Sequence, residues 1–353
     1  FVTKYVLNHS FIKYIFKVNI PSFTLNNGLK IPAVGYGTWV NVDKNSRLLL
    51  EDKPKLLEAM SHAIDVGYRH LDTAHLYRTE PEVGWVVRKK IQEGVITREQ
   101  MFITTKVWQH NHRPEDVEAS VRGSLQRMGL DYVDLVLMHW PMAISVEGAD
   151  EKIDYIETWR GFESVLDKGL AKSIGISNFN AQQIERLLRN CRVKPVVNQV
   201  ELNINLAQKD LVSYCQKNDI QCVAYTPFGS MMPSREDPNN EGTKVDDPRL
   251  TSIAKKHGKT VGQIALRHLY ERGLVAIPKT ITKSRVVENA SIFDFQLDAS
   301  DVETLNALDN GYRTVRPLFW QEYEYYPFDR VDAPIPKIPE QYLKWEDGGK
   351  IDI

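Results

Sequence analysis

Short β-rich runs that alternate with amphipathic stretches limit the folds open to this chain more than any other feature. Between residues 30 and 290, eight runs favour strands, and stretches with a helical hydrophobic period separate them. The runs are 31–37, 68–72, 101–106, 132–139, 171–177, 195–200, 221–225 and 274–279. The helices expected between them are 53–66, 80–93, 114–129, 155–168, 180–190, 207–218 and 248–272. Eight such repeats predict an α/β fold, the closed (β/α)8 TIM barrel.

A doubly wound open sheet is the alternative architecture. Such sheets usually carry GxGxxG directly after the first strand, where the glycines let the backbone approach a phosphate. The corresponding segment here, 35–39, reads GYGTW and lacks the third glycine, and no GxxxxGK motif occurs in the chain. The sequence therefore favours the barrel.

Two segments lie outside the repeat. A β-hairpin is predicted at 22–31 with Asn27-Gly28 as its turn. From about residue 311 the chain is rich in aromatic residues and proline, and we expect this loop and tail to lie over the substrate mouth of the barrel. The predicted division is an N-terminal extension at 1–20, the barrel at 21–328 and a C-terminal tail at 329–353.

Composition excludes several classes of partner. The 45 basic and 46 acidic side chains leave a net charge of −1, without the basic patch that nucleic-acid binding needs. No stretch approaches the roughly 20 apolar residues of a membrane span, and lysines interrupt the apolar residues of the first twenty, which argues against a signal peptide. Three scattered cysteines, without a CxxC pair, suit a reducing compartment, so we expect a cytoplasmic protein.

Polar residues recur where the predicted strands end. In a (β/α)8 barrel the chemistry is built from the C-terminal ends of the strands and the loops that follow. The seven strands after the first end at or beside Asp72, Lys106, His139, Ser177 with Asn178, Gln199, Tyr225 and Lys279. Alone, each has a structural explanation, such as a turn cap, a solvated strand end or a core histidine. Together they predict one polar rim, which Tyr77, five residues after Asp72, also reaches.

This set of residues suits carbonyl reduction. Tyr77 can protonate a developing alkoxide if a nearby ammonium lowers its pKa, and Lys106 can supply that charge. Asp72 is a plausible partner for a buried Lys106, and His139 can orient the carbonyl oxygen through a hydrogen bond. Because no side chain donates hydride, a nicotinamide cofactor is required.

Asp72, Tyr77, Lys106 and His139 resemble the catalytic tetrad of the aldo-keto reductases, which include the aldose and aldehyde reductases, in identity, order and approximate separation. They lie within YRHLDTAHLY, TTKVW and LMHWP. The resemblance extends from about residue 22 to 328 and includes GYGTW, GISNFN, AYTPFGS and IPKTITKSRVVEN. It implies a monomeric enzyme that reduces small-molecule aldehydes or ketones, with Tyr77 as the general acid.

The resemblance also implies a site for NADPH or NADP+. The nicotinamide end would be held by Ser177, Asn178 and Gln199, with Tyr225 stacked on the ring and Thr38 and Trp39 lining the floor. The 2′-phosphate would be held by Lys279, Thr280 and Arg285, and the adenine by Glu288 and Asn289. A guanidinium with a second cation suits a 2′-phosphate, which NADH lacks. Without the family, 279–285 is an ordinary basic start to a helix.

The substrate walls depart from the usual family pattern. Strand seven carries Thr226 in place of the family's serine, the loop at 142–155 is short and acidic, and the loop at 231–248 has no tryptophan. The expected substrate-binding residues are Trp39, Trp108, His139 and Trp140, a large apolar set that suits aromatic aldehydes or steroid ketones. The segment HWPMAIS is similar to an arthropod branch that includes 3-dehydroecdysone 3-reductases.

Two other functions compete with this interpretation. A metal-dependent hydrolase is suggested by His70, Asp72, His75 and the HNH at 110–112, but these residues are divided between a strand and two loops, so we expect no metal site. A non-catalytic NADPH-binding subunit would usually have lost part of the tetrad, whereas all four residues are present here.

Overall fold

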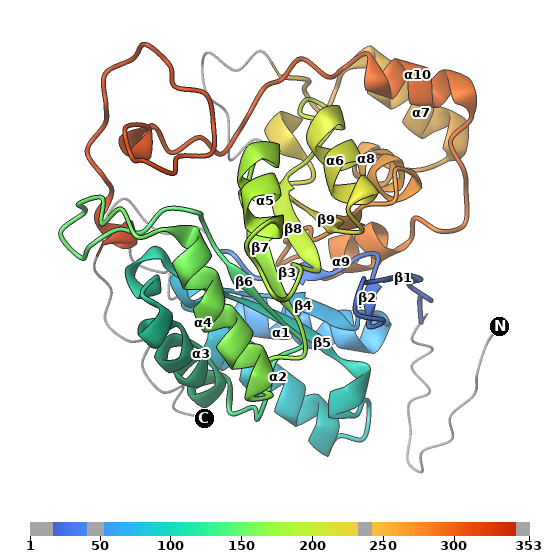
Figure 1. The fold of residues 1–353 in the computed structure, drawn as a ribbon. Coiled ribbons are helices and arrows are strands. Elements are labelled where there is room, and N and C mark those ends of the chain that lie inside the picture. The colour runs from blue at the N-terminus through green and yellow to red at the C-terminus, as the bar shows by residue number, and fades with distance from the viewer. Residues whose placement is uncertain (1–16, 41–52, 232–241, 344–353) are drawn as a thin grey trace.

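The protein is described by a computed structural model over residues 17–40, 53–231 and 242–343. Its core is a sheet of eight parallel strands, ordered β10-β9-β8-β7-β6-β5-β4-β3 (Figure 1). The strands are β3 (Tyr36–Gly37), β4 (His70–Asp72), β5 (Phe102–Val107), β6 (Leu135–Met138), β7 (Ile174–Ser177), β8 (Val197–Glu201), β9 (Gln221–Tyr225) and β10 (Val275–Ala276). The sheet closes where Val34 forms a parallel bridge with Ala276 and the amide of Gly35 donates to the Ala276 carbonyl at 2.9 Å. The predicted barrel is confirmed.

Helices alternate with these strands around the sheet (Figure 1). They are α1 (Lys53–Val66), α2 (Glu80–Gln92), α3 (Pro114–Met128), α4 (Tyr155–Asp167), α5 (Ala181–Leu188), α6 (Lys209–Lys217), α7 (Pro248–His257), α8 (Val261–Glu271), α9 (Lys283–Ala290) and α10 (Ala299–Asn306). Each buries an apolar side against the strands or a neighbouring helix, which is why the hydrophobic period locates most of them. Among the described residues, no helix combines the length and apolar character that a bilayer span requires.

Two predicted elements are wrong in their extent. The single helix expected at 248–272 is two helices, because Gly258 adopts a left-handed conformation with φ 61° and Thr260 begins α8 with a capping box. The strand expected at 31–37 is also divided, since its first residues belong to the hairpin and only Tyr36–Gly37 forms β3. Helix α10 was not among the helices expected, and α9 was anticipated only as a basic helix start at 279–285.

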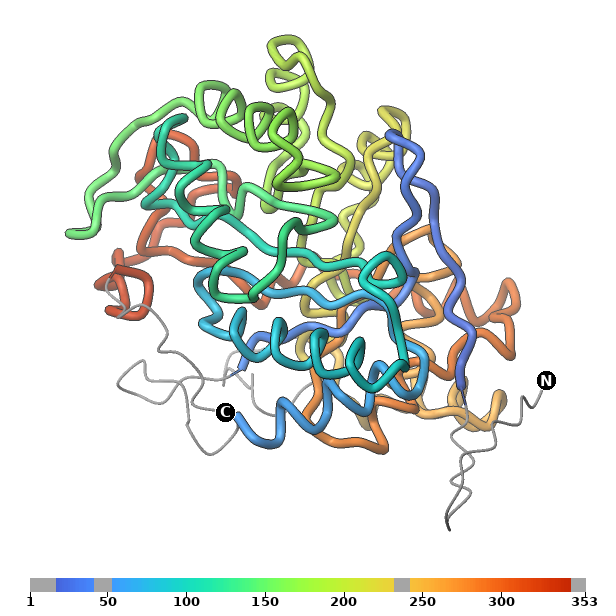
Figure 2. The backbone as a smooth tube through the Cα atoms, turned by 90° about the horizontal axis from the view of Figure 1, so that it is seen from below, coloured from blue at the N-terminus to red at the C-terminus, as the bar shows by residue number. Residues whose placement is uncertain are grey.

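The predicted hairpin closes one end of the barrel. Strands β1 (Ser22–Thr24) and β2 (Lys30–Pro32) pair antiparallel, and Gly28 supplies the φ of 86° that their turn requires. The side chain of Asn26 donates to the carbonyls of Pro195 and Asp219 at 3.0 and 3.1 Å, and Figure 2 shows the blue tip of the hairpin beside the yellow part of the chain. The buried hairpin residues Leu25 and Ile31 pack with interior residues of β6, β8, β9 and β10. A substrate site can therefore lie only at the opposite end of the barrel, where the strands have their C-terminal ends.

The C-terminal tail crosses that opposite end. The buried carboxylate of Glu201, at the end of β8, accepts the amides of Thr314 and Val315 at 2.8 and 2.7 Å. Farther along, the side chain of Gln183 donates to the carbonyl of Tyr325 at 2.9 Å. The tail includes two short 3-10 helices, η7 (Leu318–Trp320) and η8 (Glu340–Tyr342), and its aromatic side chains form one cluster with residues of the barrel mouth. Parts of the predicted extensions, 1–16 and 344–353, lie outside the described residues.

Candidate active site

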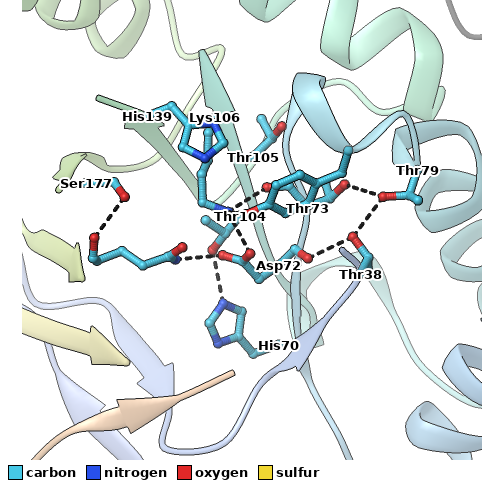
Figure 3. Close-up of polar contacts among 12 residues, drawn as sticks. Thr38, His70, Asp72, Thr73, Thr79, Thr104, Thr105, Lys106, His139 and Ser177 are labelled. Atoms are coloured by element: carbon cyan, nitrogen blue, oxygen red, sulfur yellow. Dashed lines mark hydrogen bonds and ion pairs between the residues drawn. The ribbon is translucent and has the colours of Figure 1, made fainter. Parts of the chain in front are cut away.

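A buried ion pair forms the base of the site. Asp72 is the last residue of β4, and Lys106 lies near the end of β5, two residues beyond the Thr104 that faces Asp72 in the sheet. Lys106 Nζ lies 2.6 Å from Asp72 Oδ1, and both residues are 1% exposed (Figure 3). Two neighbouring parallel strands therefore bring opposite charges together where water is excluded.

The remaining hydrogen bonds of this pair are also satisfied. Lys106 Nζ donates to the Thr73 carbonyl at 3.0 Å, and the Gln199 side chain donates to Asp72 Oδ2 at 2.8 Å. The backbone carbonyl of Asp72 accepts from both the amide and the hydroxyl of Thr38 at 3.0 Å. Burial lowers the pKa of Lys106, and the negative charge of Asp72 opposes that effect. Asp72 thus favours the charged form of Lys106 and holds the ammonium in place.

Tyr77 faces this pair from the next loop. It ends the 3-10 helix η2 (His75–Tyr77), after which Arg78 turns the chain with φ 57°. The Tyr77 hydroxyl accepts a hydrogen bond from Lys106 Nζ at 3.3 Å, and the ammonium lies 4.7 Å from the centre of its ring. Trp39 contacts the same ring with a centroid distance of 5.0 Å. The phenol is therefore held against a buried cation.

His139 completes the four predicted catalytic residues. It follows β6, is 7% exposed, and its ring lies 5.8 Å from that of Tyr77 and 5.2 Å from that of Trp108. Its carbonyl accepts from the Asn178 side chain at 2.9 Å. Burial, assisted by the positive charge of Lys106, holds the pKa of His139 well below its usual range. The imidazole is therefore neutral near neutral pH.

The residues expected at the nicotinamide lie together beside the tetrad. Ser177 Oγ donates to the Gln199 carbonyl at 2.8 Å, and the Tyr225 hydroxyl donates to the Asn178 side-chain oxygen at 2.7 Å. Asn178 holds the unusual φ of 63°, and its side-chain amide donates to the Ser177 hydroxyl at 3.2 Å. Amide and hydroxyl groups can bind a carboxamide, and half-buried Tyr225 supplies an aromatic ring, so this set fits a nicotinamide. Thr38, by contrast, is fully buried below Asp72.

The residues expected at the adenosine end lie just before α9 and along its length. Lys279 is half-buried, Thr280 lies just before the helix, and Arg285 is exposed on its first turns. Glu288 already accepts from the Thr260 hydroxyl at 2.6 Å, and Asn289 is 4% exposed. Two cations at an exposed helix start fit a phosphate group.

Aromatic residues form the walls of the site. One of the expected substrate-binding residues, Trp108, is more deeply buried than the others. Trp39 is partly exposed and Trp140 is 6% exposed, whereas Trp108 is 0% exposed because the tail covers it. A hydroxyl network that was not predicted lies beside the site, where Thr79 is 2.8 Å from Thr38 and 3.0 Å from Thr73. Threonine at those spacings carries no recognisable signal, so only the fold brings these hydroxyls together.

The residues of the alternative metal hypothesis do not share one site. His70 is buried at the base of the barrel, with Nε2 3.0 Å from the Thr104 hydroxyl, whereas His75 lies on η2. Within the described ranges, no group of three or more His, Cys, Asp or Glu side chains is arranged to hold a metal ion.

Comparison with known proteins identifies the family. The model of the Aldo/keto reductase family matches residues 33–310. The chain belongs to this family. Aldo-keto reductase AKR2E4 of Bombyx mori is 42% identical over 310 residues, which cover 88% of this chain and 99% of that protein. The predicted family, and the oxidoreductase class that it implies, are confirmed.

Solved structures of relatives agree with this assignment. The crystal structure of aldo-keto reductase AKR2E5 complexed with NADPH has 63% identity and a TM-score of 0.90, covering 94% of this reductase and 99% of that chain. Another AKR2E5 structure is from the silkworm, Bombyx mori. Bombyx mori AKR2E4 in complex with NADP has 40% identity and a TM-score of 0.83, covering 88% of this reductase and 100% of that chain.

His112, beside the site, predicts a pH dependence of stability. It is 0% exposed, neither ring nitrogen has a hydrogen-bond partner among the described residues, and burial with the nearby His110 lowers its pKa to about 3. Its unfolded form binds a proton below about pH 6.5 while the native form does not, so stability falls as pH falls. From pH 7.5 to 5 this histidine should remove about 2 kcal/mol from the free energy of unfolding.

Urea unfolding of the parent and of His112→Gln at both pH values measures this contribution. The variant should lose less stability than the parent by about that amount. Equal losses in the two proteins would show that His112 does not make the native state sensitive to acid.

Proposed function

We propose that this protein is an NADPH-dependent carbonyl reductase that converts aldehydes or ketones to alcohols, with Tyr77 as the general acid. The observation that carries the proposal is the 3.3 Å contact between the Tyr77 hydroxyl and Lys106 Nζ, which is itself paired with Asp72 at 2.6 Å. NADPH supplies the hydride, which forms the new C–H bond at the carbonyl carbon. The proton on Tyr77 Oη passes to the carbonyl oxygen as that oxygen gains negative charge.

The surrounding residues make this proton transfer favourable. A cation beside a phenol stabilises the phenolate, and Lys106 stays oriented toward Tyr77 because Asp72 and the Thr73 carbonyl hold it from the other side. Neutral His139 can donate a hydrogen bond to the substrate oxygen without placing a second charge beside Lys106. The site thus supplies an acid, its activating cation and an orienting donor.

The cofactor proposal draws on the rim and on the relatives. Ser177, Asn178 and Gln199 would hold the carboxamide, and Tyr225 would stack on the nicotinamide. Lys279 and Arg285 would hold the 2′-phosphate, with Thr280, Glu288 and Asn289 nearby. The AKR2E5 and AKR2E4 structures are complexes with NADPH and NADP, respectively.

All of the proposed catalytic residues come from one chain, so we propose that a monomer is active. Cys191, Cys215 and Cys222 are free thiols, which suits the cytoplasm. The substrate is a small-molecule carbonyl compound. The aromatic mouth formed by Trp39, Trp140 and the tail supports an apolar substrate, an aromatic aldehyde or, as the alternative, a steroid-like ketone such as 3-dehydroecdysone.

Tyr77→Phe tests the catalytic role. The ring and its contacts with Trp39 and His139 remain, but the transferable proton is lost, so kcat with an aldehyde and NADPH should fall about 100-fold or more. NADPH affinity, measured by fluorescence titration, should remain within about twofold of the parent. A variant with parental turnover would refute Tyr77 as the acid, and a parent that binds NADPH but reduces no carbonyl would favour the non-catalytic subunit.

Arg285→Ala tests the cofactor end. Loss of the guanidinium should raise the KM for NADPH about tenfold or more and leave the KM for NADH unchanged. Lys283→Ala is the matched control, because it removes an exposed cation from the same helix, one that pairs with Glu58 at 2.9 Å. Equal effects of the two substitutions, or equal effects on both cofactors, would contradict specific binding of the 2′-phosphate.

A further inference from the structure

The last described residues of the chain form a strap, Ile338 to Leu343, over the barrel mouth. The strap lies beyond residue 310, where the family match ends, and contains η8. Its two apolar ends pack beside Gly148 in the loop between β6 and α4, where an added Cβ would lie 2.9 Å from Ile338 Cδ1 and 3.2 Å from Leu343 Cδ2. The strap therefore connects the last described residues to a loop at the barrel mouth.

Tyr342 is the residue of the strap that reaches the site. Its ring is stacked on that of Trp108, with a centroid distance of 5.9 Å and an angle of 20°, and its carbonyl accepts the Trp108 indole N–H at 3.2 Å. Phe319 and Trp320 contact the same tyrosine ring at 5.4 and 5.5 Å. A stack and a hydrogen bond together fix both the position and the rotation of the indole.

Trp108 transmits this contact to the catalytic residues. Its ring lies 5.2 Å from that of His139 and is 0% exposed. Trp108 therefore contacts both the His139 ring and the Tyr342 ring. Tyr342 and Trp320, whose ring also lies 5.9 Å from the indole, together limit its movement.

We propose that Tyr342 is a specificity-determining positioning residue, which fixes Trp108 as a rigid wall beside His139. The inference rests on the proposed carbonyl reduction and deepens it. With the wall fixed, the site takes slim carbonyl compounds, such as straight-chain and single-ring aldehydes, and excludes fused-ring ketones. A packed interior resists displacement, so a bulky substrate must either displace the three rings or lose its alignment with Tyr77.

The strap lies outside the apolar core of the barrel. The residues before it, 334–337, are exposed, and Ile335 is 53% exposed. The barrel core and the hairpin lie in other clusters. A change at Tyr342 should therefore alter the wall without unfolding the protein.

The experiment compares Tyr342→Ala with the parent, with Tyr342→Phe, which keeps the stacked ring, and with Ile335→Ala, a control at an exposed tail position. kcat/KM is measured with NADPH for benzaldehyde and for a 3-oxo steroid, and thermal unfolding checks each fold. Tyr342→Ala should raise kcat/KM for the steroid about tenfold or more, mainly through KM, because relief of a steric wall has effects of that size. Benzaldehyde should change less than about twofold, and the other two variants should match the parent.

Equal changes for both substrates in Tyr342→Ala would overturn the proposal, as would no change at all, or a parent that already reduces the steroid as efficiently as benzaldehyde. If neither the parent nor any variant reduces a carbonyl, the proposed function fails. The role of Tyr342 is then tested separately, by calorimetric titration of the NADP+-loaded parent and variants with the two corresponding alcohols. Tighter binding of the steroid alcohol to Tyr342→Ala alone would support the strap. Equal affinity of the parent and Tyr342→Ala for the steroid alcohol would reject the proposed role of Tyr342.

Discussion

The buried ion pair between Lys106 and Asp72 is the interaction on which the rest of this structure depends. Two charges that are each 1% exposed are costly unless nearly every hydrogen bond is made, and here the Gln199 side chain and the Thr73 carbonyl provide those bonds. Neighbouring strands of a parallel barrel supply this geometry because their C-terminal ends converge. Such a pair adds little to the free energy of unfolding, but it fixes the Lys106 ammonium at a defined point beside the Tyr77 phenol.

The two ends of the barrel are covered by different segments of the chain. The hairpin fills one end with apolar side chains and hydrogen-bonds to the backbone there, so that end contributes stability. The tail covers the other end, anchored by the buried carboxylate of Glu201. Because the tail is held at its start and at Trp108, it can shape the mouth while the strands hold the reacting groups. In the proposed mechanism, catalytic geometry and substrate preference would therefore depend on different parts of the chain.

Much of this site could be predicted from the sequence, because a strand end has a definite position in a barrel. Asp72, Lys106 and His139 lie at strand ends and converge as expected, and Tyr77 follows on a short loop. The tail contacts could not be predicted, since Trp108 and Tyr342 are 234 residues apart and no period or turn motif relates them. The break at Gly258 was missed because the apolar pattern of α7 and α8 runs past a glycine that serves as a C-cap.

The central claim, that the Asp72 charge sustains Lys106 and through it the acidity of Tyr77, is tested most directly by the pH profile of kcat in Asp72→Asn. The amide keeps the shape but removes the charge that opposes the effect of burial on the pKa of Lys106. We expect kcat to fall about 100-fold with a displaced pH profile. Asp134→Asn, which alters a buried carboxylate paired with Arg98, should lose stability but keep the parental profile. Parental kcat and an unchanged profile in Asp72→Asn would contradict the account.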